Sequence, residues 1–108
     1  MKISVIGLGF VGFPLYLTLL NSKNSALKAT GIEDNSIFGK NKVKKIFQTK
    51  KNYFNNKELD NLYNRHKKKF NISTNYLKAL DSDYLFICLP FNINKQLKTN
   101  ESKFFDLI

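Results

Sequence analysis

The sequence predicts an α/β fold built on a doubly wound parallel sheet, and three observations lead to this class. Residues 3–6 are mostly apolar and run directly into Gly7-Leu-Gly9-Phe-Val-Gly12, a glycine pattern typical of a turn between a strand and a helix. Segments with strand and helix periodicity then alternate along the chain, which is typical of parallel strands joined by crossover helices. The apolar run Tyr84–Leu89 has the pattern of a central strand buried on both faces.

The first three elements are a strand, a helix and a second strand. The first strand is expected at residues 2–6 and the helix at Phe10–Asn21. Pro14 lies in the first turn of that helix, where its missing N–H breaks no hydrogen bond. The second strand is expected at Leu27–Ile32. The helix is expected to bury a broad apolar face made of Val11, Leu15, Leu17, Thr18, Leu19 and Leu20.

The later elements are shorter and continue the alternation. In chain order they are helical spacing at Lys40–Phe47, a loop at Thr49–Asn56, a helix at Lys57–Lys69, a short strand at Phe70–Ser73, a short helix at Asn75–Leu80 and the strand at Tyr84–Leu89. Pro90 ends that strand, and Glu101–Ile108 has the pattern of another helix start. Because 108 residues are fewer than the roughly 150 of a full domain of this kind, we expect an incomplete sheet of about four strands.

Each glycine of the first turn has a separate predicted role. Gly7 allows the tight turn off the strand, and Gly12 lets the helix pack close to that strand. Gly9 has no side chain, so the backbone can approach a phosphate group. Together with Phe10 and Val11, these glycines form a predicted binding site for the pyrophosphate of a dinucleotide, at a helix N-terminus where free N–H groups favour negative charge.

Glu33 is the second predicted cofactor residue. It ends the second strand, 21 residues after Gly12, at the place where an acid binds the adenine ribose. A carboxylate there accepts hydrogen bonds from both ribose hydroxyls and repels a 2′-phosphate, so NAD is favoured over NADP. Asp34 points the other way, because successive side chains of a strand alternate. The alternative is that Glu33 is a solvated acid at a strand end.

The formal net charge of +10 comes almost entirely from lysine. The lysines are spread among many asparagines, and the only arginine, Arg65, is the residue type preferred for bidentate phosphate and base recognition. We therefore expect no nucleic-acid partner. No apolar run approaches the roughly 20 residues of a membrane span, and the start of the chain does not have the pattern of a signal peptide. We expect a cytoplasmic protein without membrane association.

The sequence offers no catalytic residue and no metal site. Cys88, the single cysteine, lies inside an apolar run and is interpreted as a small core residue. His66 is the only histidine and is expected to be a surface residue without a chemical role. The triplet Lys67-Lys68-Lys69 is expected at the C-terminus of its helix, where cations are favourable.

Four stretches in register resemble the UDP-glucose/GDP-mannose dehydrogenases, the nucleotide-sugar dehydrogenases. Residues 1–15 resemble the opening of the family, with its Gly-Leu-Gly-aromatic-Val-Gly-apolar-Pro string. The segment Asp83–Pro90 resembles the family's Asp-hydrophobic-Cys-Val-Pro strand. Thr30–Glu33 resembles the family's Gly-Val-Asp motif, whose acid binds the ribose. Lys42-Val43 resembles the Lys-Val pair in the helix that follows this motif in the family.

The resemblance implies a Rossmann-like NAD-binding domain and an enzyme that oxidises the C6 alcohol of a nucleotide-linked sugar to a carboxylate with two NAD. It implies that Pro90 is a cofactor residue. In the family, a cysteine, a lysine and substrate-binding groups come from later domains. Residues 1–108 are therefore expected to be a partial NAD-binding domain that turns over no nucleotide sugar by itself; the substrate belongs to a full-length parent.

Two departures from the family pattern bear on the site. Phe91-Asn92 stand where the family has a cofactor-binding threonine and a proline, and an asparagine near Asn56 replaces an acid. Two alternatives stay open. One is an NAD-binding regulatory domain without chemistry. The other is an NAD-linked dehydrogenase of the hydroxyacid or 6-phosphogluconate type.

Overall fold

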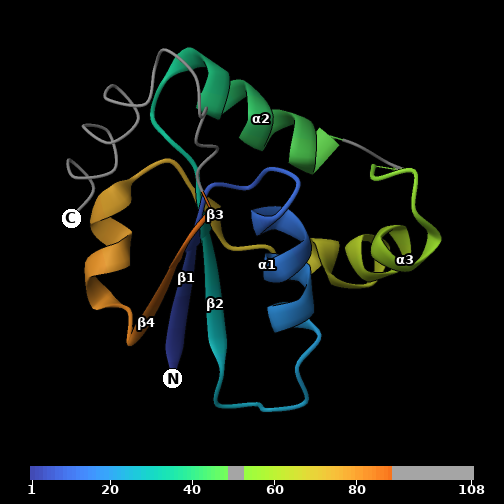
Figure 1. Ribbon diagram of the computed structural model, residues 1–108, viewed down its shortest axis with the longest axis horizontal. Coiled ribbons are helices and arrows are strands. Elements are labelled where there is room, and N and C mark those ends of the chain that lie inside the picture. The colour runs from blue at the N-terminus through green and yellow to red at the C-terminus, as the bar shows by residue number, and fades with distance from the viewer. Residues whose placement is uncertain (49–52, 89–108) are drawn as a thin grey trace, which may run out of the picture.

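Four parallel strands in the order β3-β2-β1-β4 form the centre of the molecule (Figure 1). The computed structural model describes residues 1–48 and 53–88. The strands are β1 (Lys2–Ile6), β2 (Lys28–Ile32), β3 (Ile72–Ser73) and β4 (Tyr84–Ile87). The predicted class, an α/β fold with a parallel Rossmann-like sheet, is confirmed.

Helical segments connect the strands. They are α1 (Gly12–Leu20), α2 (Ile37–Gln48), α3 (Lys57–His66), and the 3-10 turns η1 (Lys67–Lys69) and η2 (Tyr76–Asp81). In Figure 1, α1 and α3 lie on one side of the sheet and the orange η2 segment lies on the other. Among the described residues, no helix is long and apolar enough to cross a membrane.

The helix bounds differ from the prediction at four places. α1 spans Gly12–Leu20 rather than Phe10–Asn21. α2 begins at Ile37 rather than Lys40, because Ser36 precedes it and its hydroxyl accepts a hydrogen bond from the Gly39 N–H. The predicted helix over Lys57–Lys69 is α-helical only to His66 and ends in a 3-10 turn of three lysines. The segment after Asn75 is a 3-10 helix, and the Asn75 side chain caps it by accepting the Leu77 N–H.

The predicted apolar face of α1 is wrong in part. Val11 precedes the helix and is 70% exposed, and Thr18 is exposed and donates its hydroxyl to the Pro14 carbonyl at 2.9 Å. Of the predicted residues, Leu17 is buried, and Leu15, Leu19 and Leu20 are half-buried against the core. The other buried residues of α1 are Gly12, Phe13 and Tyr16. Because α1 is apolar on almost every side, periodicity alone did not distinguish the buried face.

An aromatic cluster fills the space between α1 and α3. Its centre is Phe13, and the surrounding rings are Tyr16, Tyr53, Phe54, Tyr63 and Phe70. The hydroxyl of Tyr16 accepts a hydrogen bond from the Asn71 N–H at 2.8 Å and donates to the Asn71 carbonyl at 3.3 Å. Burial raises the pKa of Tyr16 to about 12, against the opposing effect of its bond to Asn71. These two bonds fix the start of β3 against α1.

The prediction that Tyr84–Leu89 is a central strand buried on both faces is wrong for the described residues. β4 pairs only with β1, and Tyr84, Leu85 and Phe86 are 59%, 43% and 43% exposed. Its other edge has no partner strand within residues 1–48 and 53–88. Residues 49–52 of the predicted loop, Leu89, Pro90, Phe91-Asn92 and the predicted helix start at Glu101–Ile108 lie outside the described residues.

His66 is buried, so its expected place on the surface is wrong. The side chain is 9% exposed and its Nε2 lies 2.9 Å from Asn21 Oδ1, at the C-terminal end of α1. Arg65 Nη1 donates to the same oxygen at 3.2 Å. Burial lowers the pKa of His66, and the positive charges of Arg65 and Lys69 lower it further. The histidine joins α3 to α1 as a neutral ring.

This lowered pKa predicts a loss of stability below neutral pH. Between the folded pKa and the ordinary value of about 6.5, the unfolded chain binds more protons than the folded chain. The free energy of unfolding should therefore fall as pH drops below about 6.5, with a slope of at most ~1.4 kcal/mol per pH unit. Urea unfolding between pH 5 and 8 measures this slope. The variant His66→Gln should flatten it, and an unchanged slope in the variant would contradict the assignment.

Candidate functional site

The ends of the strands bring the predicted cofactor residues to one edge of the sheet. Hydrogen bonds continue the strand pairing beyond the strands themselves. Gly7 N donates to Ile32 O at 2.8 Å, Glu33 N donates to Ser73 O at 2.9 Å, and Cys88 N donates to Ile6 O at 2.7 Å. In a doubly wound sheet, ligands bind at this carboxyl edge. The glycine turn and Glu33 are therefore neighbours in space.

The glycine turn has the geometry predicted for Gly7 and Gly12. Gly7 adopts a φ of 91°, which side chains rarely tolerate. A Cβ on Gly12 would lie 1.6 Å from the carbonyl oxygen of Gly7 and 3.1 Å from Cys88 Cβ, so the helix touches the strand end directly. Gly9 differs from both, because a Cβ there would meet no atom of residues 1–48 and 53–88 within 4 Å. The turn therefore has no room for a side chain at Gly12, whereas the space beside Gly9 is open.

The start of α1 presents unsatisfied hydrogen-bond donors beside this open space. In the described parts of the chain, the N–H groups of Gly9, Phe10 and Val11 donate to no protein acceptor. The carbonyls of Gly9 and Val11 already accept the first helical bonds, at 3.1 Å from Phe13 N and 3.2 Å from Leu15 N. Val11 provides no side-chain cap. A helix N-terminus of this kind favours an anion.

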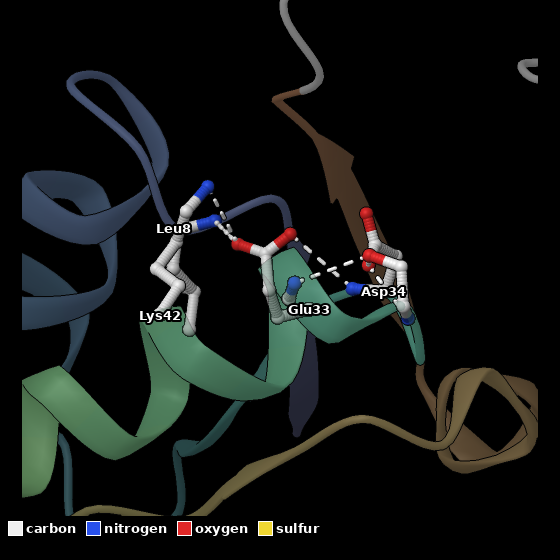
Figure 2. Close-up of polar contacts among 6 residues, drawn as sticks. Leu8, Glu33, Asp34 and Lys42 are labelled. Atoms are coloured by element: carbon white, nitrogen blue, oxygen red, sulfur yellow. Dashed lines mark hydrogen bonds and ion pairs between the residues drawn. The ribbon is translucent and has the colours of Figure 1, made fainter.

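Glu33 is buried and its carboxylate points at the glycine turn (Figure 2). Only 4% of Glu33 is exposed, so the alternative of a solvated acid is excluded. Oε2 accepts the Leu8 N–H at 2.9 Å and lies 3.2 Å from Lys42 Nζ. Oε1 accepts the Asp34 N–H at 3.2 Å. The acid therefore joins β2, the glycine turn and α2.

The first turn of α2 fixes the position of this acid. Asp34 points away from Glu33, as predicted, and its Oδ1 accepts hydrogen bonds from the backbone N–H, at 2.9 Å, and the hydroxyl of Ser36. A Cβ on Gly39 would lie 2.1 Å from the Asp34 carbonyl oxygen, so only glycine permits this approach. As a result, α2 begins directly against the end of β2 and directs Lys42 back toward Glu33 (Figure 2).

A shallow hollow lies beyond the ends of β2 and β3. It is lined by Asn35 and by the segment Thr74–Leu77. Burial raises the pKa of Tyr76, and the negative charges of Asp34 and Glu33 raise it further, which places the phenol near both acids. Asn35 comes two residues after Glu33, and Thr74 follows Ser73, whose carbonyl accepts the Glu33 N–H. The hollow therefore lies at the same edge of the sheet as Glu33.

The predicted residues Gly7, Gly9, Gly12 and Glu33 come together at this edge, and Phe10 and Val11 lie beside them. Four contributions were missed by sequence reasoning. The missed groups are the Leu8 N–H, Ser36, Gly39 and Lys42. An Asp-x-Ser sequence ahead of a helix is a capping pattern that predicts the earlier start of α2. No local pattern predicts the contact of Lys42 with Glu33.

The described residues contain neither an activated cysteine nor a cluster of metal ligands. Cys88 is half-buried against the core, as predicted, and burial raises the pKa of its thiol, which keeps it protonated and unreactive. Within residues 1–48 and 53–88, no three His, Cys, Asp or Glu side chains lie close enough to hold a metal ion. The site as described can bind and orient a ligand.

Comparison with solved structures finds the same fold in a known protein. A solved structure, the NDP-N-acetyl-D-galactosaminuronic acid dehydrogenase from Methanosarcina mazei Go1, matches with a TM-score of 0.67 and 21% sequence identity. The match covers 83% of this chain and 19% of that chain, so this chain spans about a fifth of the length of the dehydrogenase. It shows a shared fold. No curated protein matches the chain.

Nearly the whole sequence matches one protein family. Residues 1–105 match the NAD binding domain of the UDP-glucose/GDP-mannose dehydrogenase family. The match spans the glycine turn, Glu33 and Cys88, which are the residues placed at the carboxyl edge of the sheet. The chain therefore belongs to the UDP-glucose/GDP-mannose dehydrogenase family, and it corresponds to the domain that binds NAD in that family.

Proposed function

We propose that this chain binds NAD with the pyrophosphate against the start of α1. The observation that carries the proposal is the open space above Gly9 next to the unsatisfied N–H groups of Gly9, Phe10 and Val11. A phosphate at that position accepts hydrogen bonds from the backbone and is stabilised by the helix dipole. Gly12 keeps α1 close to β1, so the donors stay at the edge of the sheet.

Glu33 and the neighbouring hollow are proposed to hold the adenosine half of the cofactor. Oε2 of Glu33 is engaged by the Leu8 N–H and by Lys42, whereas among the described residues Oε1 accepts only the longer bond from Asp34. Oε1 therefore keeps a lone pair for a ribose hydroxyl. The hollow between Asn35 and Tyr76 is proposed for the adenine, because it lies at the same edge of the sheet as Glu33.

The proposed context is the NAD-binding portion of a nucleotide-sugar 6-dehydrogenase. When bound, NAD supplies the hydride acceptor for oxidation of the sugar alcohol. The residues of this chain bind and orient the cofactor, and the nucleotide sugar is proposed to bind to other domains of a longer parent. The family assignment and the shared fold support this context.

A second candidate is NAD binding without chemistry. It is favoured by the protonated, half-buried thiol of Cys88 and by the lack of a metal-ligand cluster among the described residues. Incubation of the chain with NAD and UDP-glucose, followed by absorbance of NADH, tests this candidate. NADH formation would contradict the binding-only candidate.

Calorimetric titration of NAD against the wild type and Gly9→Val tests the proposed site. The variant should remain folded, because a Cβ at Gly9 meets no atom of the described part of the chain within 4 Å and the backbone there is not left-handed. Its affinity for NAD should fall at least ~100-fold, because the side chain occupies the space of the phosphates. Ser25→Val, in an exposed loop at the opposite edge of the sheet, is the matched control. Absence of NAD binding by folded wild type would refute the proposed function.

A further inference from the structure

Asn35 brings an uncommitted side-chain amide to the hollow beyond β2 and β3. The residue is exposed and lines the hollow. Within residues 1–48 and 53–88, its side chain makes no hydrogen bond. Asn75, the other asparagine at the hollow, differs, because its Oδ1 accepts the Leu77 N–H at 3.0 Å. The Asn35 amide therefore keeps two N–H donors and a carbonyl acceptor for a ligand.

Hydrogen bonds fix the backbone on both sides of the hollow. On one side, Asp34 Oδ1 accepts the Ser36 N–H at 2.9 Å, which closes the turn that contains Asn35. On the other side, Ser73 Oγ accepts the Asn75 N–H at 3.1 Å, at the start of the opposite wall. The hollow is therefore already formed without a ligand, and little ordering of the chain opposes binding there.

The rest of the lining suits a flat heterocyclic ring. Tyr76 is half-buried and Leu77 is 69% exposed, and both line the hollow. A base stacks on an aromatic side chain through its face, so stacking does not distinguish one base from another. The Thr74 hydroxyl can donate or accept by rotating, so it does not distinguish them either. Asn35, whose donors and acceptor lie side by side on one planar group, is the residue of the hollow that can.

We propose that Asn35 is a specificity-determining residue that selects adenine by hydrogen bonds to the edge of the base. The inference rests on the proposed function, which places the adenine in this hollow, and adds the selection of the base. Adenine presents its N6 amino donor beside the N7 acceptor, and an asparagine amide pairs with both. Hypoxanthine presents two acceptors at this edge, O6 and N7. The amide then keeps only one of its two bonds, and the dinucleotide that carries hypoxanthine binds more weakly.

The test is a calorimetric titration of NAD and of nicotinamide hypoxanthine dinucleotide, which differ at the 6-position of the purine. The wild type should bind the hypoxanthine dinucleotide at least ~10-fold more weakly than NAD. In Asn35→Ala, NAD should bind more weakly and the ratio of the two dissociation constants should fall below ~3-fold, because neither purine meets the amide.

Two matched variants serve as controls and should keep the wild-type ratio within ~2-fold. Asn41→Ala removes an exposed amide of α2 that does not line the hollow. Tyr76→Phe removes the phenol hydroxyl of the hollow and keeps the ring that stacks.

Three results would overturn the inference. One is a wild type that binds the two dinucleotides with constants within ~3-fold of each other. Another is a wild-type ratio in Asn35→Ala whose circular dichroism is that of the folded chain. The third is a ratio that Tyr76→Phe abolishes, which would assign the selection to the phenol. In all three the wild type still binds NAD. Failure of the proposed function is a different outcome, in which folded wild type does not bind NAD.

Discussion

Gly12→Ala is expected to lower the free energy of unfolding by at least ~3 kcal/mol. The new Cβ would lie 1.6 Å from the carbonyl oxygen of Gly7 and 2.8 Å from its carbonyl carbon. Both atoms are backbone, so neither can rotate away, and α1 must move off the strand end. A domain of this size loses about 4–8 °C of melting temperature per kcal/mol. Thermal unfolding followed by circular dichroism should therefore show a shift larger than ~12 °C.

Gly9→Ala is the control for that experiment. It adds the same methyl group three residues earlier, where no atom of the described residues lies within 4 Å and no left-handed backbone is required. Its stability should stay within ~0.5 kcal/mol of the wild type. If Gly12→Ala were as stable as Gly9→Ala, the close contact of helix and strand would not describe the folded chain.

Phe13→Ala is expected to cost about 3–5 kcal/mol of stability. The Phe13 ring is fully buried, and its centroid lies 5.1 Å from that of Tyr53 and 5.2 Å from that of Phe54. The rings of Phe70 and Tyr63 follow at 5.8 and 6.2 Å. Removal of the central ring leaves a cavity that four neighbours line, and they belong to segments distant in the chain. Urea unfolding gives the energy, and near-ultraviolet circular dichroism reports the loss of fixed aromatic packing.

Phe38→Ala provides the comparison for the Phe13 variant. Phe38 is 84% exposed on α2, so its truncation removes little buried surface and should change stability by less than ~0.5 kcal/mol. A similar loss in both variants would mean that the aromatic cluster is not the main core of the chain.

The fold was predictable where local sequence carries a backbone requirement. The turn at Gly7 needs a positive φ, and the contact at Gly12 needs a missing Cβ, so both positions show directly in the sequence. The alternation of strands and helices likewise follows from periodicity. The apolar run at β4 correctly predicted a strand but wrongly predicted that it is buried on both faces. Burial depends on what packs beside a strand, which the run itself does not show.

The site was less predictable, because its polar contacts join segments through space. Glu33 was identified by its spacing in the sequence from the glycine turn. Its contacts with the Leu8 N–H and with Lys42, which accompany its burial, could not be identified in this way. Lys42 reaches it only because α2 starts at Ile37, which the Ser36 cap decides. His66 was expected on the surface because a polar residue near a helix end gives no indication that Asn21 faces it.

The pairing of β1 with β4 has a consequence for synthesis and folding. β1 is made first, and it pairs with β2 on one edge and with Tyr84–Ile87 on the other. A ribosome adds about 5–20 residues per second, so β1 waits on the order of ten seconds for its second neighbour. The pairing of β1 with β4 closes a loop that contains all the chain between these two strands. This closure costs chain entropy and slows folding. Until β4 is made, the apolar strand Ile3–Ile6 has one edge open to pairing with other chains.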